Sequence, residues 1–262
     1  MYKKTLLVVV ILLTAITTAF AQTAADFSVE LTADGSGVLI KRYLGKVLTV
    51  KVPDIIEGMP VKEIGREAFH GLDTAKVTSV ILPQGLTKIW ERAFIYQVNL
   101  ISVVIPNTVT EIGNEAFRQC SVLKSVDIPD SVTTLGKYAF YQTGIEKFTL
   151  GKGITVIPDD LFYGCKLQSA VVIPEGVTEI GDMAFGGNYS FTSLTLPSTI
   201  KKIASGAFIS CGSLTTVTIP DSVETIEFFL SYDSSNKAFE NCPKLNLASQ
   251  AALKRRGYTG KF

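Results

Sequence analysis

Four cysteines are the residues of this chain best suited to chemistry, because a thiol can be a nucleophile, a metal ligand or half of a disulfide. Each one follows a phenylalanine by three residues, and the four are Cys120, Cys165, Cys211 and Cys242. Other residues hold the same place after other phenylalanines, namely Leu72, Gln97, Thr143 and Asn188. A column of thiols spread along an axis does not converge on a metal ion. We therefore interpret Cys120 as a packing residue and predict no metal site.

Two of these cysteines could still form a disulfide. Cys120 and Cys165 lie two repeats apart, too far for the roughly 4.4–6.8 Å between Cα atoms that a disulfide allows. Cys211 and Cys242 come from neighbouring repeats, so a bond between them is geometrically possible in an exported chain. The sequence leaves this pairing open.

The remaining candidates for catalysis lack partners. His70 is the one histidine, and we interpret it as a surface turn residue because the repeat places no triad or metal partner beside it. Asp159 and Asp160 fall where other copies have polar turn residues, which favours a solvated turn. The GKG at 151–153 lacks the third glycine and the helix of a nucleotide-binding loop. We predict no enzyme activity and no cofactor.

The phenylalanines belong to an internal repeat that runs along most of the chain. Ala-Phe or Leu-Phe pairs end at positions 69, 94, 117, 140, 162, 185, 208 and 239. A proline after Ile, Leu or Val recurs in step with them, and Gly151 fills its place in one copy. One unit reads VVIPNTVTEIGNEAFRQCSVLKS (103–125), and VVIPEGVTEIGDMAF (171–185) repeats its first part. A period of about 23 residues predicts a stack of similar structural units.

Each unit carries the pattern of two short strands. Leu123, Val126 and Ile128 alternate with polar residues, as in a half-buried strand, and Pro129 ends the pairing because it has no N–H to donate. A second apolar pair and the Ala-Phe then follow before the chain turns. One unit cannot bury its own apolar face, so neighbouring units must stack. The sequence predicts a β-rich solenoid of about eight repeats.

Several copies depart from the pattern. The first carries the insert IIEGMP (55–60), and the fourth is one residue short at 142–144. The fifth lacks its proline, and the eighth contains the insert EFFLSYDSSNK (227–237) or part of it. Insertions in repeat proteins map to loops on one face, often the binding face.

The N-terminus has the features of a secretory signal. Lys3 and Lys4 precede an apolar run that is short for a membrane span, and Ala19-Phe20-Ala21 fits a cleavage site. We expect residues 1–21 to be removed, an uncleaved anchor being the alternative. The remaining chain has 23 basic and 24 acidic residues, a net charge of about −1. We therefore expect no nucleic-acid partner and no membrane span after removal of the signal.

The repeat V-x-I-P-x-x-V-x-x-I-G-x-x-A-F-x-x-C-x-x-L-x-S resembles the BspA-like, treponemal class of leucine-rich repeats over about residues 50–248. Residues 22–49 resemble the hairpin that often precedes such arrays, and the Asp-Gly-Ser-Gly at 34–37 also indicates a hairpin turn. We expect residues 249–262 to form a C-terminal helical cap with Ser249 as N-cap and Gly257 as its stop. The resemblance implies an extracellular protein-binding module, and it does not imply a catalytic site.

Three groups of residues are candidates for binding a protein. Ile81 and Val104 stand at outward strand positions and would form an apolar ledge, although such residues also simply suit strands. Surface aromatic residues are enriched in binding hot spots. The aromatic candidates for binding are Trp90, Tyr96, Tyr138, Tyr141 and Tyr163. The alternative is that these side chains are partly buried between adjacent turns. The insert near position 230 is either a binding loop or part of the cap, and its aromatic residues are Phe228, Phe229 and Tyr232.

These observations favour a secreted, periplasmic or surface-exposed protein that binds other proteins without catalysis. The resemblance implies adhesion to host matrix proteins or to other cells. The alternative is a structural, envelope-associated repeat protein without a host ligand. A contiguous exposed apolar or aromatic patch would favour a binder.

Overall fold

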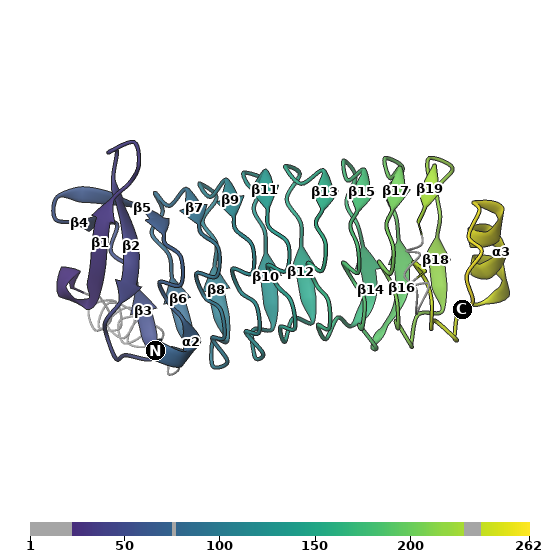
Figure 1. Ribbon diagram of the computed structural model, residues 1–262, viewed down its shortest axis with the longest axis horizontal. Helices are drawn as coiled ribbons and strands as arrows, with labels where there is room; N and C mark the ends of the chain where they lie inside the picture. The colour runs from purple at the N-terminus through teal and green to yellow at the C-terminus, as the bar shows by residue number, and fades with distance from the viewer. Residues whose placement is uncertain (1–22, 75–76, 228–236) are drawn as a thin grey trace, which may run out of the picture.

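The computed structural model describes residues 23–74, 77–227 and 237–262. The chain forms a β-solenoid of about eight coils, stacked one after another along the long axis (Figure 1). This confirms the predicted fold class. Each regular coil contributes one strand to each of two sides of the solenoid, and turns carrying the Ala-Phe pairs close it.

We call the two sides face A and face B. Face A contains the first strand of each repeat: β3 (Thr49–Lys51), β6 (Ser79–Ile81), β8 (Ser102–Val104), β10 (Ser125–Asp127), β12 (Lys147–Thr149), β14 (Ser169–Val172), β16 (Phe191–Thr195) and β18 (Thr216–Thr218). Face B contains the second strands: β5 (Met59–Ile64), β7 (Lys88–Ile89), β9 (Glu111–Ile112), β11 (Thr134–Leu135), β13 (Val156–Ile157), β15 (Glu179–Ile180), β17 (Lys202–Ile203) and β19 (Thr225–Ile226). Where these strands pair, they pair in parallel.

The N-terminal hairpin is confirmed. Strands β1 (Phe27–Leu31) and β2 (Val38–Tyr43) pair antiparallel after a short 3-10 helix at Ala24–Asp26, and β2 pairs in parallel with β5. In the turn, the Asp34 carboxylate accepts hydrogen bonds from the Ser36 amide and the Thr32 hydroxyl, which lower its pKa to about 2. The insert at 55–60 forms a second hairpin, in which β4 (Ile55–Ile56) pairs with β5.

The repeat phenylalanines form the core of the solenoid. Their rings stack from coil to coil, with centroids 5.0 Å apart for Phe94–Phe117 and 5.2 Å apart for Phe117–Phe140. The preceding alanine leaves room for the backbone bonds between coils, as in the 2.8 Å bond from Phe94 N to Ala116 O. All eight repeat phenylalanines are fully buried. Burial of such a ring contributes about 1.5–3 kcal/mol, and a well-placed aromatic pair adds about 0.5–1.5 kcal/mol.

The cysteine column has a role beyond packing. Cys120 Sγ donates to Phe94 O at 3.2 Å, and the same bond to the phenylalanine of the preceding coil is made by Cys165, Cys211 and Cys242. Gln97 and Asn188 use their side-chain amides in the same way, bonding to Phe69 O at 2.6 Å and Phe162 O at 2.8 Å. Each of these donors satisfies a buried carbonyl. Leu72, at the same place in the first copy, is exposed instead.

The four thiols are free and buried. Burial raises the pKa of Cys120 well above its usual value and that of Cys165 to about 11, so neither is a thiolate near neutral pH. Cys211 and Cys242 are not joined by a disulfide, and burial raises the pKa of Cys211. The pairing that the sequence leaves open is therefore not formed in this structure.

The C-terminal helix starts earlier than predicted. Helix α3 (Leu247–Arg255) has Asn246 as its N-cap, whose Oδ1 accepts a hydrogen bond from Ser249 N at 2.8 Å, so the prediction of Ser249 as N-cap was wrong. Ser249 lies in the first turn, and its hydroxyl accepts from Val217 N of β18 at 3.0 Å. Gly257 ends the segment with a φ of +86°. The ring of Tyr258 then packs edge-on against Phe239, which closes the aromatic stack.

A second helix, α2 (Gly71–Thr74), makes a single turn in the first copy. Of the helices in the part of the chain described, none is long and apolar enough to cross a membrane.

Candidate functional site

Face A is interrupted twice, because its strands form three separate sheets, β3-β6-β8, β10-β12 and β14-β16-β18. Strands β8 and β10 remain in contact across the first break, and the second lies between β12 and β14. Face B is interrupted one strand earlier, between β11 and β13. The coil 147–168 therefore pairs backward through β12 and forward through β13. We call the space between β12 and β14 the seam.

The sequence of this coil accounts for the interruption. Phe148 occupies the inward strand position that a smaller aliphatic residue fills elsewhere, in Val50, Val80, Val103, Val126, Val171, Leu194 and Val217. Those seven residues are buried, whereas Phe148 is only partly buried. Gly151 replaces the proline, and a Cβ built on it would lie 2.1 Å from Pro129 O. The coil lies close to the preceding one at this point, as regular coils do at Gly113 and Gly136, while a bulky ring fills the space toward the next.

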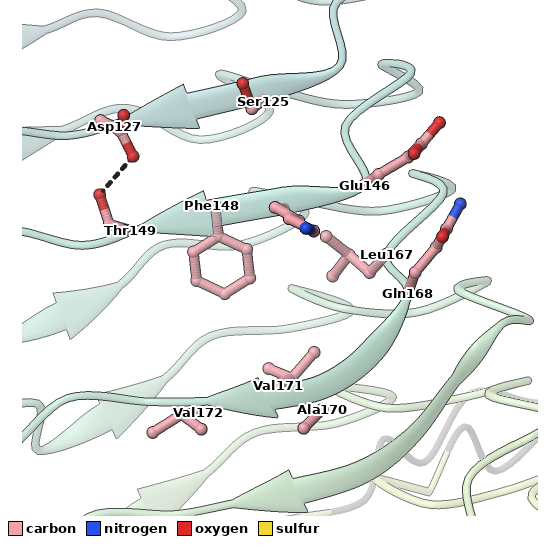
Figure 2. Close-up of a pocket in the computed structure, with 11 residues that line it drawn as sticks. Ser125, Asp127, Glu146, Phe148, Thr149, Leu167, Gln168, Ala170, Val171 and Val172 are labelled. Atoms are coloured by element: carbon pink, nitrogen blue, oxygen red, sulfur yellow. Dashed lines mark hydrogen bonds between the residues drawn. The ribbon is translucent and has the colours of Figure 1, made fainter.

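The seam is a groove of about 500 Å³ on face A. Figure 2 shows Phe148 pointing from β12 into the space between the two strands, with Leu167 beside it and Val171 on β14 opposite. The Phe148 ring stacks on Phe162 of the core with centroids 4.4 Å apart, so it forms a fixed apolar floor. Exposed Ala170 lines the wall on β14. This volume is within the range of about 300–1,000 Å³ typical of ligand sites.

Polar groups at the rim of the seam are mostly paired. The Lys124 ammonium lies 2.6 Å from Glu146 Oε1, and this hydrogen bond lowers the pKa of Glu146. The Thr149 hydroxyl donates to the Asp127 carboxylate at 2.8 Å. Lys147 is exposed and makes no ion pair with any residue the structure describes. The rim therefore carries one positive charge that is not neutralised by a direct contact.

The predicted ledge lies elsewhere on face A. Ile81 and Val104 are direct partners in the register of β6 and β8, with exposed fractions of 43% and 65%. Their side chains are therefore adjacent, as the sequence predicts. Val172, on the outward side of β14, is also exposed, but it belongs to the seam.

The predicted aromatic residues form separate groups. The rings of Tyr141 and Tyr163 stack 5.2 Å apart, and Tyr138 contacts Tyr141 edge-on at 5.7 Å. Tyr96 packs instead against His70, with ring centroids 5.7 Å apart. Tyr138 is exposed, as a binding residue would be, whereas Tyr96, Tyr141 and Tyr163 are partly buried. Exposure and partial burial, the two alternatives left open by the sequence, therefore both occur among these tyrosines.

Trp90 lies on face B. Its Nε1 donates to Glu63 Oε2 at 2.5 Å, and the Lys88 ammonium lies 3.7 Å from the ring centroid. The ring lines a cavity of about 330 Å³ together with residues of β1 and β2 such as Glu30 and Leu39. Phe228, Phe229 and Tyr232 lie outside the described residues.

The acidic pair is less solvated than predicted. Asp159 Oδ1 accepts a hydrogen bond from Asp182 N at 3.0 Å. Burial raises the pKa of Asp160 to about 6, against a lowering hydrogen bond from Tyr138. Both residues lie in a turn, but Asp160 is half-buried, so the interpretation as a simple solvated turn was incomplete. Within residues 23–74, 77–227 and 237–262, no group of three His, Cys, Asp or Glu side chains is arranged to hold a metal ion.

The sequence analysis does not predict the seam, although the sequence contains two signals for it. The aromatic Phe148 interrupts a column of aliphatic residues, and Gly151 interrupts the column of prolines in the same coil. Lys147 and Ala170 give no such signal, because only the pairing of β12 and β14 shows that they border a groove.

Comparisons with known proteins identify a family. The profile of the BspA type leucine rich repeat region matches residues 49–168 and 155–249. A leucine-rich repeat protein of T. pallidum is similar in structure, with a TM-score of 0.65, 27% identity, and coverage of 92% of this chain and 98% of that one. No protein of curated function matches the chain.

Two further solved structures share the fold. A leucine rich cell surface protein of Faecalibacterium prausnitzii has a TM-score of 0.52 at 20% identity, covering 87% of this chain and 82% of that one. The pneumococcal vaccine antigen PcpA has a TM-score of 0.52 at 16% identity, covering 76% of this chain and 69% of that one.

Proposed function

The chain belongs to the BspA-type leucine-rich repeat family, and from this premise we propose that it is an exported protein that binds other proteins at or beyond the cell surface. We further propose an adhesin-like role toward host matrix proteins or other cells, without catalysis. The observation that carries the proposal is the exposed apolar ledge of Ile81 and Val104 on a regular part of face A. Adjacent exposed apolar side chains on a rigid sheet are typical of protein-binding surfaces.

The sequence and the relatives support export. The residues before Gln22 have the features of a signal peptide. One structural relative is described as a cell surface protein and another as a vaccine antigen. Mass spectrometry of the product exported from a bacterial host that expresses the full chain should find an N-terminus near Gln22. Retention inside the cell with Met1 intact would contradict export.

Binding is tested by surface plasmon resonance of residues 22–262 over immobilised fibronectin, fibrinogen, collagen and laminin. We expect saturable binding to at least one of them, weakened at least tenfold by the double substitution Ile81→Ser and Val104→Ser. Thr195→Ser with Thr218→Ser is the matched control, because these residues hold the same outward positions on β16 and β18 and are also exposed. The absence of saturable binding to all four would refute matrix adhesion and favour an envelope-associated structural role.

A further inference from the structure

We propose that the seam binds an extended segment of a partner protein, which pairs as an added strand alongside β12. This inference deepens the proposed function. It rests on that function because it takes the ligand of this chain to be a protein. It assigns a site other than the ledge and states the chemistry of the segment that fits.

The backbone supplies the first argument. After β3, β10 and β14 the next residue donates across to the following coil, as Ile128 N does to Thr149 O and Ile173 N to Thr195 O, both at 3.0 Å. Leu82, Ile105 and Leu196 N make no such bond to the described residues. The corresponding amide, Leu150 N, makes no backbone hydrogen bond to the described part of the chain. No ladder joins β12 to β14 in these residues, and on this face the two coils meet only at the start of the groove, where Gln168 N donates to Glu146 O at 3.1 Å. Unpaired strand edges are templates for a further strand, and binding by strand addition uses such edges.

The floor of the groove determines the inward side chain of the segment. In the register of β10 with β12, Val126 lies opposite Phe148, and both point inward. A segment on the other edge of β12 would place its central residue over the Phe148 ring in the same way. The ring already fills part of the space, so this residue must be small and apolar, such as alanine or valine. An apolar floor with unpaired backbone on its walls suits a polypeptide better than a compact polar molecule.

The rim determines the outward side chains. The first residue of β12 is Lys147, which has no ion-pair partner among the described residues, while Glu146 and Asp127 are already engaged. A carboxylate beside Lys147 would complete the pairing at this rim. Two positions later the segment would lie beside Thr149, where a β-branched residue suits the strand. The predicted segment is therefore acidic, small apolar and β-branched, in that order and parallel to β12.

The probe is a fluorescein-labelled peptide, GDVTVG with an amidated C-terminus, titrated with residues 22–262 and followed by fluorescence anisotropy. We expect saturable binding with a Kd below 1 mM. N-methylation of its threonine removes the backbone donor that would face Phe148 O and leaves the side chains unchanged, so it should weaken binding at least tenfold. Replacing its aspartate by lysine should also weaken binding, and the variant Lys147→Glu should reverse that preference.

Ala170→Arg is the blocking variant, because Ala170 is exposed and lines the groove. Thr216→Arg is its matched control, since Ala170, Ser193 and Thr216 hold equivalent positions in the register of β14, β16 and β18. We expect Ala170→Arg to abolish peptide binding and Thr216→Arg to leave it unchanged. Hydrogen exchange should show new protection at 147–150 and 169–172 on binding. Equal binding by both variants, or no binding by the unsubstituted protein, would overturn the inference.

The two proposals fail separately. If the peptide does not bind while a matrix protein binds through the ledge, the seam inference is wrong and the proposed function stands. If the peptide binds and none of the four matrix proteins does, the seam is a peptide site and matrix adhesion is wrong.

Discussion

The three strands β14, β16 and β18 and the single strand β12 come from the same repeat, yet they produce different surfaces. In the first group, the inward residues Val171, Leu194 and Val217 are buried and the strands pair in register. In β12, Phe148 is the inward residue, and the sheet stops at its edge. The difference indicates that a mismatch of side-chain volume can end the pairing even where the period of the repeat continues. It is not the sole cause on face A, since β8 and β10 do not pair either, although Val103 and Val126 are their inward residues.

The interruption is limited to the two faces. On the turn side the core rings continue past the seam, with centroids 5.6 Å apart for Phe140–Phe162 and 5.7 Å for Phe162–Phe185. The corresponding separation in the regular region is 5.4 Å, for Phe185–Phe208. Backbone bonds also continue there, as from Phe162 N to Ala184 O at 2.8 Å. The solenoid therefore remains one array while a groove opens on face A.

The largest expected contrast is between two phenylalanines. Phe117→Ala removes a fully buried ring that stacks on both neighbours and should lower the free energy of unfolding by about 3–5 kcal/mol. Phe148→Ala removes a partly buried ring that borders the groove and should cost about 1–2 kcal/mol. Urea denaturation followed by circular dichroism measures both values. Equal losses would show that the seam is packed as tightly as the rest of the core.

The second prediction concerns the donors that satisfy the phenylalanine carbonyls. Asn188 Nδ2 bonds to Phe162 O at 2.8 Å and Phe185 O at 2.9 Å, and its Oδ1 accepts from Leu167 N at 3.3 Å, so Asn188→Ala removes three buried hydrogen bonds. We expect a loss of about 2–3 kcal/mol. Cys165→Ala, in the seam coil, removes one weak thiol donor to Phe140 O and should cost about 1 kcal/mol. Thermal denaturation of the two variants gives the comparison, and a larger loss for Cys165→Ala would contradict it.

The third prediction tests the close approach at Gly151. Its Cβ would meet Pro129 O at 2.1 Å, so Gly151→Ala should destabilise the protein by about 1–2 kcal/mol. Gly85 lies in a regular coil, and a Cβ there meets nothing within 4 Å. Gly85→Ala should therefore be neutral or stabilise by up to about 1 kcal/mol, since it restricts the unfolded chain. Equal effects, measured as urea midpoints, would show that the close approach at Gly151 does not constrain the residue at this position.

The comparison also explains how far the sequence predicts this molecule. The period fixes which side chains share a column, so the solenoid, the hairpin, the buried rings and the outward positions of Ile81 and Val104 follow from it. The role of Cys120 as a donor does not follow, because the carbonyl it satisfies belongs to another coil. The seam is missed for the same reason, since it results from a failed fit between neighbours. The N-cap at Asn246 is missed because Ser249 is an equally good capping residue by type.

The smallest expected effect separates two carboxylates that hold the same place in the repeat, two residues before the core phenylalanine. In a regular coil, burial would raise the pKa of Glu115, but hydrogen bonds from Arg92 and Arg118, at 3.0 and 2.8 Å, lower it overall. In the seam coil, burial raises the pKa of Asp160 from 3.8 to about 6, and the nearby Asp159 also raises it. Opposite shifts predict opposite responses to pH.

For Asp160 the folded protein binds more protons than the unfolded chain between pH 3.8 and about 6, so its contribution to stability falls as pH rises through this window. Asp160→Asn keeps an acceptor for Tyr138 and removes the charge. It should therefore stabilise the protein by about 1 kcal/mol at pH 8, a value reduced to allow for the partial exposure of Asp160. At pH 4 it should have no such effect. For Glu115 the unfolded chain binds more protons, so Glu115→Gln should destabilise the protein at pH 8 and lose that effect as pH falls through the folded pKa. Urea midpoints of both variants at pH 4, 6 and 8 measure this. A stabilisation by Asp160→Asn that is the same at every pH would show that this carboxylate is solvated and that the seam coil does not differ from its neighbours in this respect.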